Sequence, residues 1–272
     1  MSGLWHTFLY QPLVNGLIFL YRVFGNLGLA VVTLTLIIRG LLVPLTLSSL
    51  KAAKKMRELA PEIEKLKKKY GKDRQKFAQA QMELYRQHGA NPAAGCLPQI
   101  VQLIVLIALY RAFGQVLQVD GDVIAKLNQV LYPSLQLPLE TVINTRFFYL
   151  NLSHPDVFRL PGLNFSLPGL FLILAALVQF LSSKMMAPAV AASQKKAAKT
   201  PEKTDDMATS MQSQMLYMFP LMTILIGYSF PSGLVLYWFI FSLFTAVQQY
   251  LVGGWGGLTP WVAKIGIKNE PK

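Results

Sequence analysis

One arginine lies in the middle of a long apolar stretch, Leu27 to Leu50, with the sequence LGLAVVTLTLIIRGLLVPLTLSSL. The stretch is long enough to cross a bilayer core of about 30 Å. Arg39 follows Leu27 by 12 residues, or roughly 18 Å of helix, which predicts a guanidinium near the bilayer midplane. A charge there costs roughly 2.5–3.5 kcal/mol even on the lenient insertion scale, so water or a polar partner must compensate for it.

Two threonines and a proline accompany the arginine. Thr35 precedes Arg39 by one helical turn and Thr46 follows it by two turns, on the same face. Pro44 removes the hydrogen bond to the carbonyl of Gly40, which predicts a kink beside the arginine. Two readings stay open here. Arg39 lines a water-filled groove, or it snorkels or pairs within a closed bundle.

Other apolar stretches also carry isolated polar side chains. Ser242, Thr245 and Gln249 follow Trp238 by 4, 7 and 11 residues, so the four side chains form one stripe of a helix. Each such residue alone is weak evidence for a functional site, because Ser, Thr and Gln commonly form hydrogen bonds between membrane helices that contribute about 0.6 kcal/mol apiece. Together with the arginine they predict a polar groove lined by Arg39, Thr35, Thr46, Gln102, Gln179, Trp238, Ser242 and Thr245.

The composition is that of a membrane protein and carries no sign of catalytic chemistry. Of 272 residues, 53% are hydrophobic and only 14% are charged. A single cysteine, Cys96, excludes an internal disulfide, and His6, His88 and His154 lack metal-ligand spacing. Nucleotide-binding and hydrolase motifs are absent. We therefore predict no enzyme activity, cofactor, catalytic residue or metal site.

The charges are distributed as in a polytopic membrane protein. Residues 51–90 hold 12 Lys and Arg against 5 acids, whereas residues 115–167 hold 3 against 4. The positive-inside rule therefore places residues 51–90 in the cytoplasm and the loop 115–166 outside. No Asp or Glu lies in any predicted span, which argues against a proton relay or cation pump.

The predicted fold class is all-α, with five transmembrane helices at about residues 27–50, 94–113, 167–186, 214–228 and 233–252. Residues 1–26 are predicted to form an amphipathic helix at the outer interface, with a spanning helix as the alternative. Residues 253–272 form a cytoplasmic tail, and the N-terminus lies outside. Within the outer loop, Val123 to Leu131 is expected to be helical.

Residues 51–90 are predicted to form a basic helical hairpin. Pro61 begins its first helix, Gly71 makes the turn, and Phe77 and Tyr85 belong to the apolar face of the return helix. The charge run is either a solvated loop that sets topology or a docking surface for anionic lipid, ribosomal RNA or a nascent chain.

Several motifs in this chain resemble those of the YidC/Oxa/Alb membrane protein insertases, in family order and spacing. They are GNLGLAVVTLTLIIRGLLVPLTLSSLKAAKKM at 25–56, KKKYGKD at 67–73, NPAAGCLPQIVQ at 91–102, QFLSSKMM at 179–186 and FPSGLVLYW at 230–238. The resemblance implies that Arg39 is the groove arginine and that residues 51–90 are the cytoplasmic hairpin. Departures at Ser242 and Leu103 weaken the transfer for the polar stripe of the fifth span.

The resemblance implies an insertase and chaperone in the bacterial plasma (inner) membrane. Its partners would be nascent membrane proteins and the lipid bilayer, with the ribosome and the Sec translocon as open candidates and no small-molecule substrate. Two rival hypotheses are a small-solute or anion transporter that uses Arg39, and a bundle subunit whose polar residues only join helices. Inverted repeats would favour the transporter, and none is evident in the sequence.

Overall fold

We describe the protein from a computed structural model, which covers residues 3–70, 73–90, 97–116, 123–162, 165–186 and 206–266. Most of these residues are helical, in agreement with the predicted all-α class. They fall into two compact units. The first unit draws on Met1–Leu41, Val101–Leu177 and Leu221–Phe244, and the second on Leu42–Ile100, Val178–Pro220 and Thr245–Lys272.

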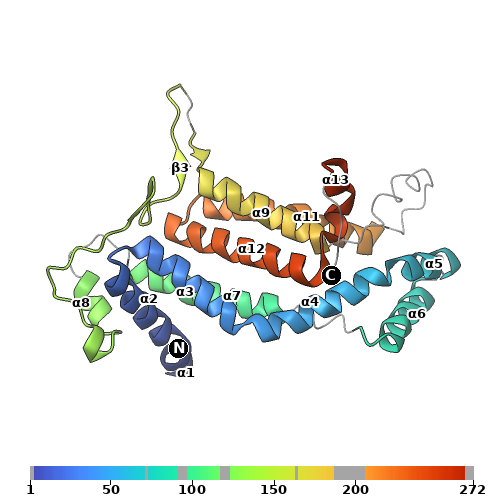
Figure 1. The fold of residues 1–272 in the computed structure, drawn as a ribbon, viewed down its shortest axis with the longest axis horizontal. Coiled ribbons are helices and arrows are strands. Elements are labelled where there is room, and N and C mark those ends of the chain that lie inside the picture. The colour runs from blue at the N-terminus through green and yellow to red at the C-terminus, as the bar shows by residue number, and fades with distance from the viewer. Residues whose placement is uncertain are drawn as a thin grey trace. The chain divides into compact units, whose positions relative to one another are not determined.

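The N-terminal segment is an amphipathic helix packed on the arginine-bearing helix. A short helix α1 (Gly3–Trp5) and a π-helical turn η1 (His6–Tyr10) lead into α2 (Gln11–Phe24). Pro12 lies in the first turn of α2, directly after the π-helical turn, and has no N–H to donate into that turn. Gly25 ends the helix with φ of 64°, in the left-handed conformation that glycine adopts readily. The buried face of α2 contacts α3 within the first unit (Figure 1). The placement of α2 at the outer interface stays a prediction.

The predicted span 27–50 is two helices rather than one. Helix α3 (Leu27–Leu41) ends just before Leu42, and α4 (Val43–Glu58) begins just after it, with Pro44 in its first turn. The proline thus interrupts the helix next to Arg39, as its missing donor predicts. The hydroxyl of Thr46 donates to the carbonyl of Leu42 at 3.0 Å. Helix α4 then continues past the apolar stretch into the basic segment as far as Glu58.

The basic segment contains the helical hairpin expected from its sequence. Helix α5 (Ala60–Tyr70) and helix α6 (Arg74–Gln87) contact one another in the second unit (Figure 1). Asp73 caps α6, because its carboxylate accepts a hydrogen bond from the backbone N–H of Lys76 at 3.1 Å. This bond, with the Lys76 side chain, lowers the pKa of Asp73. Gly71, the predicted turn residue, lies outside the described residues.

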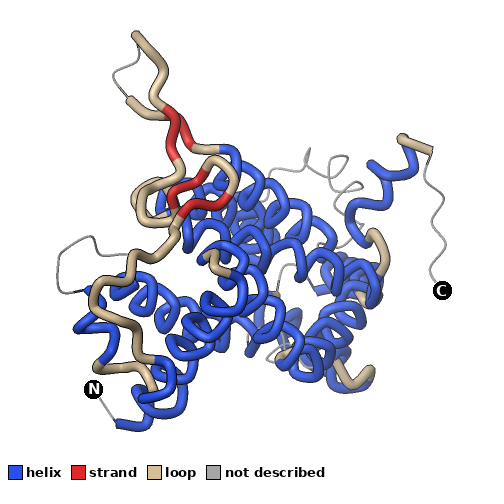
Figure 2. The backbone as a smooth tube through the Cα atoms, turned by 60° about the vertical axis from the view of Figure 1, so that its left-hand side comes forward, coloured by secondary structure: helices blue, strands red, loops and turns tan. Residues whose placement is uncertain are grey.

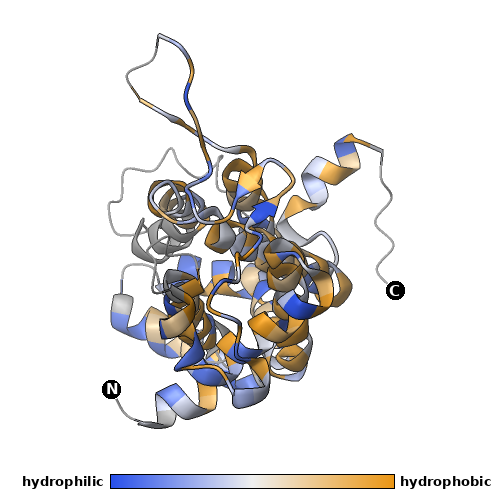
Figure 3. Cartoon of the chain, turned by 90° about the vertical axis from the view of Figure 1, so that its left-hand side faces the viewer, coloured by the Kyte–Doolittle hydropathy of each residue, from blue (hydrophilic) through white to orange (hydrophobic). Residues whose placement is uncertain are grey.

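Four further helices correspond to the remaining predicted spans. They are α7 (Leu97–Val116), α9 (Leu170–Met186), α11 (Asp206–Gly227) and α12 (Ser232–Gly253). Residues 94–96, including Cys96, lie outside the described part. Among the described helices, α12 alone is long and apolar enough to cross a bilayer by itself, and α3 with α4 meets that test as a pair. The five-span count therefore stays a prediction. Apolar residues, drawn in orange, are frequent on the helices in Figure 3.

Residues 123–162 of the predicted outer loop contain short elements and make hydrogen bonds to α2, within the first unit. Figure 2 shows the strands in red. Helix α8 (Val123–Asn128) and the 3₁₀ turn η3 (Pro133–Leu135) precede two antiparallel pairs, β1 (Arg146–Phe147) with β2 (Leu150–Asn151) and β3 (Val157–Phe158) with β4 (Leu167–Pro168). Buried Asn15 donates to Val130 O and accepts from Tyr132 N. Arg22 donates to the carbonyls of Ser134 and Gln136.

The segment after α12 contains structure that the sequence reading did not anticipate. A 3₁₀ turn η4 (Gly256–Leu258) leads to helix α13 (Thr259–Lys264). Leu258 and Val262 pack against Met185 of α9, and the Lys184 ammonium lies 3.0 Å from the centroid of the Trp261 ring. Residues 253–266 are therefore folded against α9 in the second unit.

Candidate functional site

Arg39 is almost completely buried in the first unit, against aromatic rings of α12. Its side chain is 7% exposed. The guanidinium carbon lies 4.1 Å from the centroid of the Phe241 ring and 5.2 Å from that of Phe244. Each such cation–π contact contributes about 0.5–2 kcal/mol, so the pair offsets part of the cost of the buried charge. Thr35, one turn earlier, is buried and donates its hydroxyl to Val31 O at 2.7 Å.

A second polar contact in the same unit joins α7 to α12. The Gln102 amide nitrogen donates to the Tyr237 hydroxyl at 3.0 Å, and the phenol ring of Tyr237 is itself buried. Because Tyr237 is buried, its hydroxyl would be left without a partner if this bond broke, which is costly. Trp238 and buried Ser242 follow on α12, and the Trp238 ring packs 6.1 Å from that of Phe230.

Three predicted groove residues belong to the second unit. Buried Thr46 on α4 accepts a hydrogen bond from the Gln248 amide of α12 at 3.2 Å. Gln179 on α9 and Thr245 on α12 are partly buried. The eight predicted residues thus divide between the units, with Thr35, Arg39, Gln102, Trp238 and Ser242 in the first.

The contacts from α12 come from a stripe that the sequence reading did not select. Tyr237, Phe241, Phe244 and Gln248 have the same spacing of 4, 7 and 11 as the predicted Trp238 series, one position earlier. Adjacent positions of a helix point about 100° apart. The stripe that meets Arg39, Gln102 and Thr46 is therefore the neighbouring one. Its signal in the sequence was the recurrence of aromatic rings at helical spacing.

A second arginine, Arg57 of α4, joins the ends of two helices in the second unit. Its guanidinium donates to Met185 O near the end of α9 at 2.9 Å and to Gly253 O at the end of α12 at 2.8 Å. Both carbonyls belong to the last turn of a helix, where intrahelical partners are lacking.

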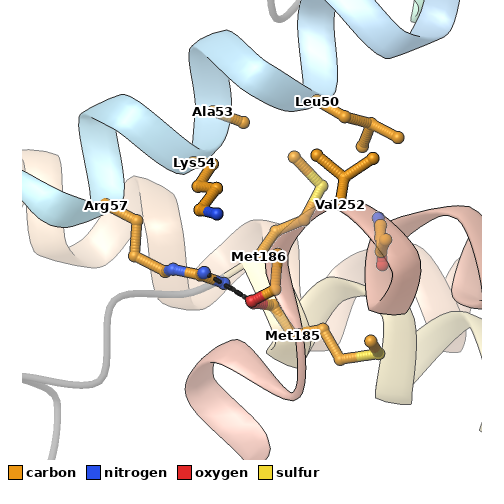
Figure 4. Close-up of a pocket in the computed structure, with 9 residues that line it drawn as sticks. Leu50, Ala53, Lys54, Arg57, Met185, Met186 and Val252 are labelled. Atoms are coloured by element: carbon orange, nitrogen blue, oxygen red, sulfur yellow. Dashed lines mark hydrogen bonds between the residues drawn. The ribbon is translucent and has the colours of Figure 1, made fainter. Parts of the chain in front are cut away.

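A solvent-open hollow lies beside Arg57 (Figure 4). Its lining comes from α4, α9 and α12 and consists of Leu50, Ala53, Lys54, Arg57, Met185, Met186, Gln249, Val252 and Gly253. Arg39 does not line it. A groove around Arg39 therefore stays a prediction.

Comparison with known proteins connects most of the chain to one group. Residues 19–255 match the family model described as "60Kd inner membrane protein". A relative named membrane protein insertase YidC, from Fusobacterium nucleatum subsp. nucleatum, is 34% identical over 90% of this chain and 97% of its own length. The insertase YidC of Pelobacter propionicus is 33% identical over 91% of this chain, which spans only 39% of that longer protein. The insertase YidC 1 of Halalkalibacterium halodurans is 29% identical, with 93% and 80% covered.

Proposed function

This chain belongs to the YidC/Oxa/Alb family of membrane protein insertases, and from that premise we propose that it inserts newly made proteins into the bacterial inner membrane and assists their folding. The family assignment favours this function over an anion transporter. The observation that carries the mechanism is the buried cation on α3, next to the break at Leu42.

The role of Arg39 in the proposal is to attract the polar end of a client. No acidic residue occurs in residues 27–50, 97–116, 170–186 or 216–253. An acidic residue of the client would therefore bring the carboxylate that these helices lack. In a low-dielectric site this attraction is far stronger than in water.

Phe241 and Phe244 control access to the arginine in this mechanism. With 7% of Arg39 exposed, a client carboxylate reaches the guanidinium only when these rings turn aside. The exchange replaces two cation–π contacts by one charge-assisted hydrogen-bonded pair, which is the stronger interaction. The client's polar end would then cross a shorter apolar barrier while its hydrophobic segment moves into lipid.

The basic hairpin supplies the first contact with clients in the proposal. The apolar stretch ends at Leu50 and the positive-inside rule places α5 and α6 in the cytoplasm, where clients emerge. The ribosome and the Sec translocon are proposed partners on that side. The same rule puts the N-terminus outside and the C-terminus in the cytoplasm.

Reconstitution tests the function directly. Purified protein in liposomes should insert a newly made single-span client with a short acidic N-terminus, measured by protease protection of that end. Protein-free liposomes give the background. Protection at background level with correctly folded protein would contradict the insertase assignment for this chain.

A further inference from the structure

The hollow of the second unit carries features of a ligand site that the insertase mechanism does not use. It lies where the apolar residues ending at Leu50 give way to the basic residues that begin at Lys51. In a membrane protein this transition marks the depth of the lipid headgroups on the cytoplasmic side.

The charge of the hollow is positive. Among the described residues, Lys54 and Arg57 line it and no acidic side chain does. Arg57 donates its hydrogen bonds to the carbonyls of Met185 and Gly253. The positive charge that is left to bind a ligand is therefore that of Lys54. The Lys54 side chain extends from α4 toward the hollow (Figure 4) and makes no ion pair within the part of the chain that the structure describes. A phosphate group complements this charge.

Gln249 adds a second, independent indication of a ligand. It lines the hollow, is only 7% exposed, and its side-chain oxygen has no hydrogen-bond partner among the described residues. A buried acceptor without a donor is costly, so a ligand that brings an N–H or O–H group gains affinity by supplying one. Leu50, Met186 and Val252 give the same hollow an apolar wall.

We propose that this hollow binds one anionic phospholipid whose headgroup carries a hydroxyl donor, of the phosphatidylglycerol type. Lys54 holds the phosphate, the Gln249 amide accepts from a headgroup hydroxyl, and the apolar wall contacts the start of the acyl chains. Basic pockets between membrane helices on the cytoplasmic side are the usual form of such sites. The site is separate from Arg39 and does not depend on the insertion mechanism.

Lipid binding to the full-length protein in detergent tests the proposal by native mass spectrometry. Dioleoyl phosphatidylglycerol should bind at least fivefold more tightly than dioleoyl phosphatidylcholine, which has no net charge and no hydroxyl donor in its headgroup. Lys54→Gln should weaken phosphatidylglycerol binding about fivefold, and Gln249→Leu about threefold or more. Lys51→Gln is the matched control, because Lys51 is exposed on the same helix but does not line the hollow. It should change binding less than twofold.

Three results would overturn the proposal. Equal affinity for the two lipids would remove the headgroup from recognition. An equal loss for Lys51→Gln and Lys54→Gln would reduce the effect to general surface charge. Binding of glycerol 3-phosphate as tight as that of the intact lipid would identify a site for free phosphate esters. Liposome insertion of a client is measured separately, so failure here leaves the proposed function standing.

Discussion

Arg39 and Arg57 lie on successive helices of one broken segment, yet their surroundings differ. Arg57 makes two charge-assisted hydrogen bonds to carbonyls at the ends of α9 and α12. Arg39 lies against the faces of Phe241 and Phe244. Without Arg57 the two carbonyls lose charge-assisted hydrogen bonds, whereas without Arg39 each ring loses a cation–π contact, which is the weaker interaction. We therefore expect Arg57 to matter for folding, whereas a role for Arg39 in client binding stays a proposal.

Among the variants that remove a side chain, the loss of Arg57 has the largest expected effect on stability. Arg57→Met removes two hydrogen bonds to a charged donor, each contributing about 1.5–3 kcal/mol, so we expect a loss of about 3 kcal/mol. In detergent this should lower the thermal midpoint by roughly 6–12 °C. Arg39→Met should change stability by less than about 1 kcal/mol, because the lost ring contacts are offset by removal of a buried charge. Equal losses of stability for the two variants would contradict the different structural roles expected of Arg57 and Arg39.

A second prediction approaches the Arg57 contact from the opposing backbone. Gly256 has φ of 51°, and a Cβ there would collide with Met185 O and the Arg57 guanidinium. Gly254 has φ of 63° but open space around its Cα. Gly254→Ala should cost about 1–2 kcal/mol for the left-handed backbone alone. Gly256→Ala should cost roughly 2 kcal/mol more, because the clash is added to the same strain.

The two glycine variants should be compared by thermal unfolding in the same detergent. If both lose the same stability, Arg57 and Met185 are free to move away from the tail. The description of residues 253–266 as folded against α9 would then be wrong.

Sequence reasoning found the helices, but it did not select the α12 rings that contact Arg39, which lie on the stripe next to the predicted groove lining. Pro44 and Pro61 mark helix boundaries locally, so the break at Leu42 and the start of α5 could be predicted from the sequence. The partners of Arg39 depend on the rotation of one helix against another, which a stripe of polar residues does not determine. Tyr237 and Phe241 look like ordinary apolar core positions in the sequence.

Arg57 and the folded tail were missed for a related reason. In the sequence Arg57 is one cation among 12 in residues 51–90. Its role comes from Met185 and Gly253, which are 128 and 196 residues away along the chain. Helix α13 has only six residues, too few for a hydrophobic period to be evident.

The smallest expected effect concerns a charge on the protein surface. The pKa of Asp73 is lowered from its ordinary value of 3.8, chiefly by the Lys76 backbone N–H. The cap therefore stabilises α6 above pH 3.8 and is lost as the pH falls through the lowered pKa. Asp73→Ala should speed hydrogen exchange of the first-turn amides of α6 without a resolvable change in the thermal midpoint. Asp73→Asn, which still caps, should not. Unchanged hydrogen exchange in the Ala variant would contradict the claim that Asp73 stabilises the start of α6.

The proposal that Arg39 attracts the acidic end of a client is tested most directly by the insertion of a matched pair of clients by Arg39 variants. The two clients differ only in whether the translocated N-terminal end carries acidic residues or their amides. We expect Arg39→Ala to insert the acidic client at least tenfold more slowly while retaining most insertion of the neutral one. Arg39→Lys, which keeps the charge without the planar fork, should retain substantial insertion of both. Insertion of both clients at the wild-type rate by Arg39→Ala would contradict the charge-attraction mechanism.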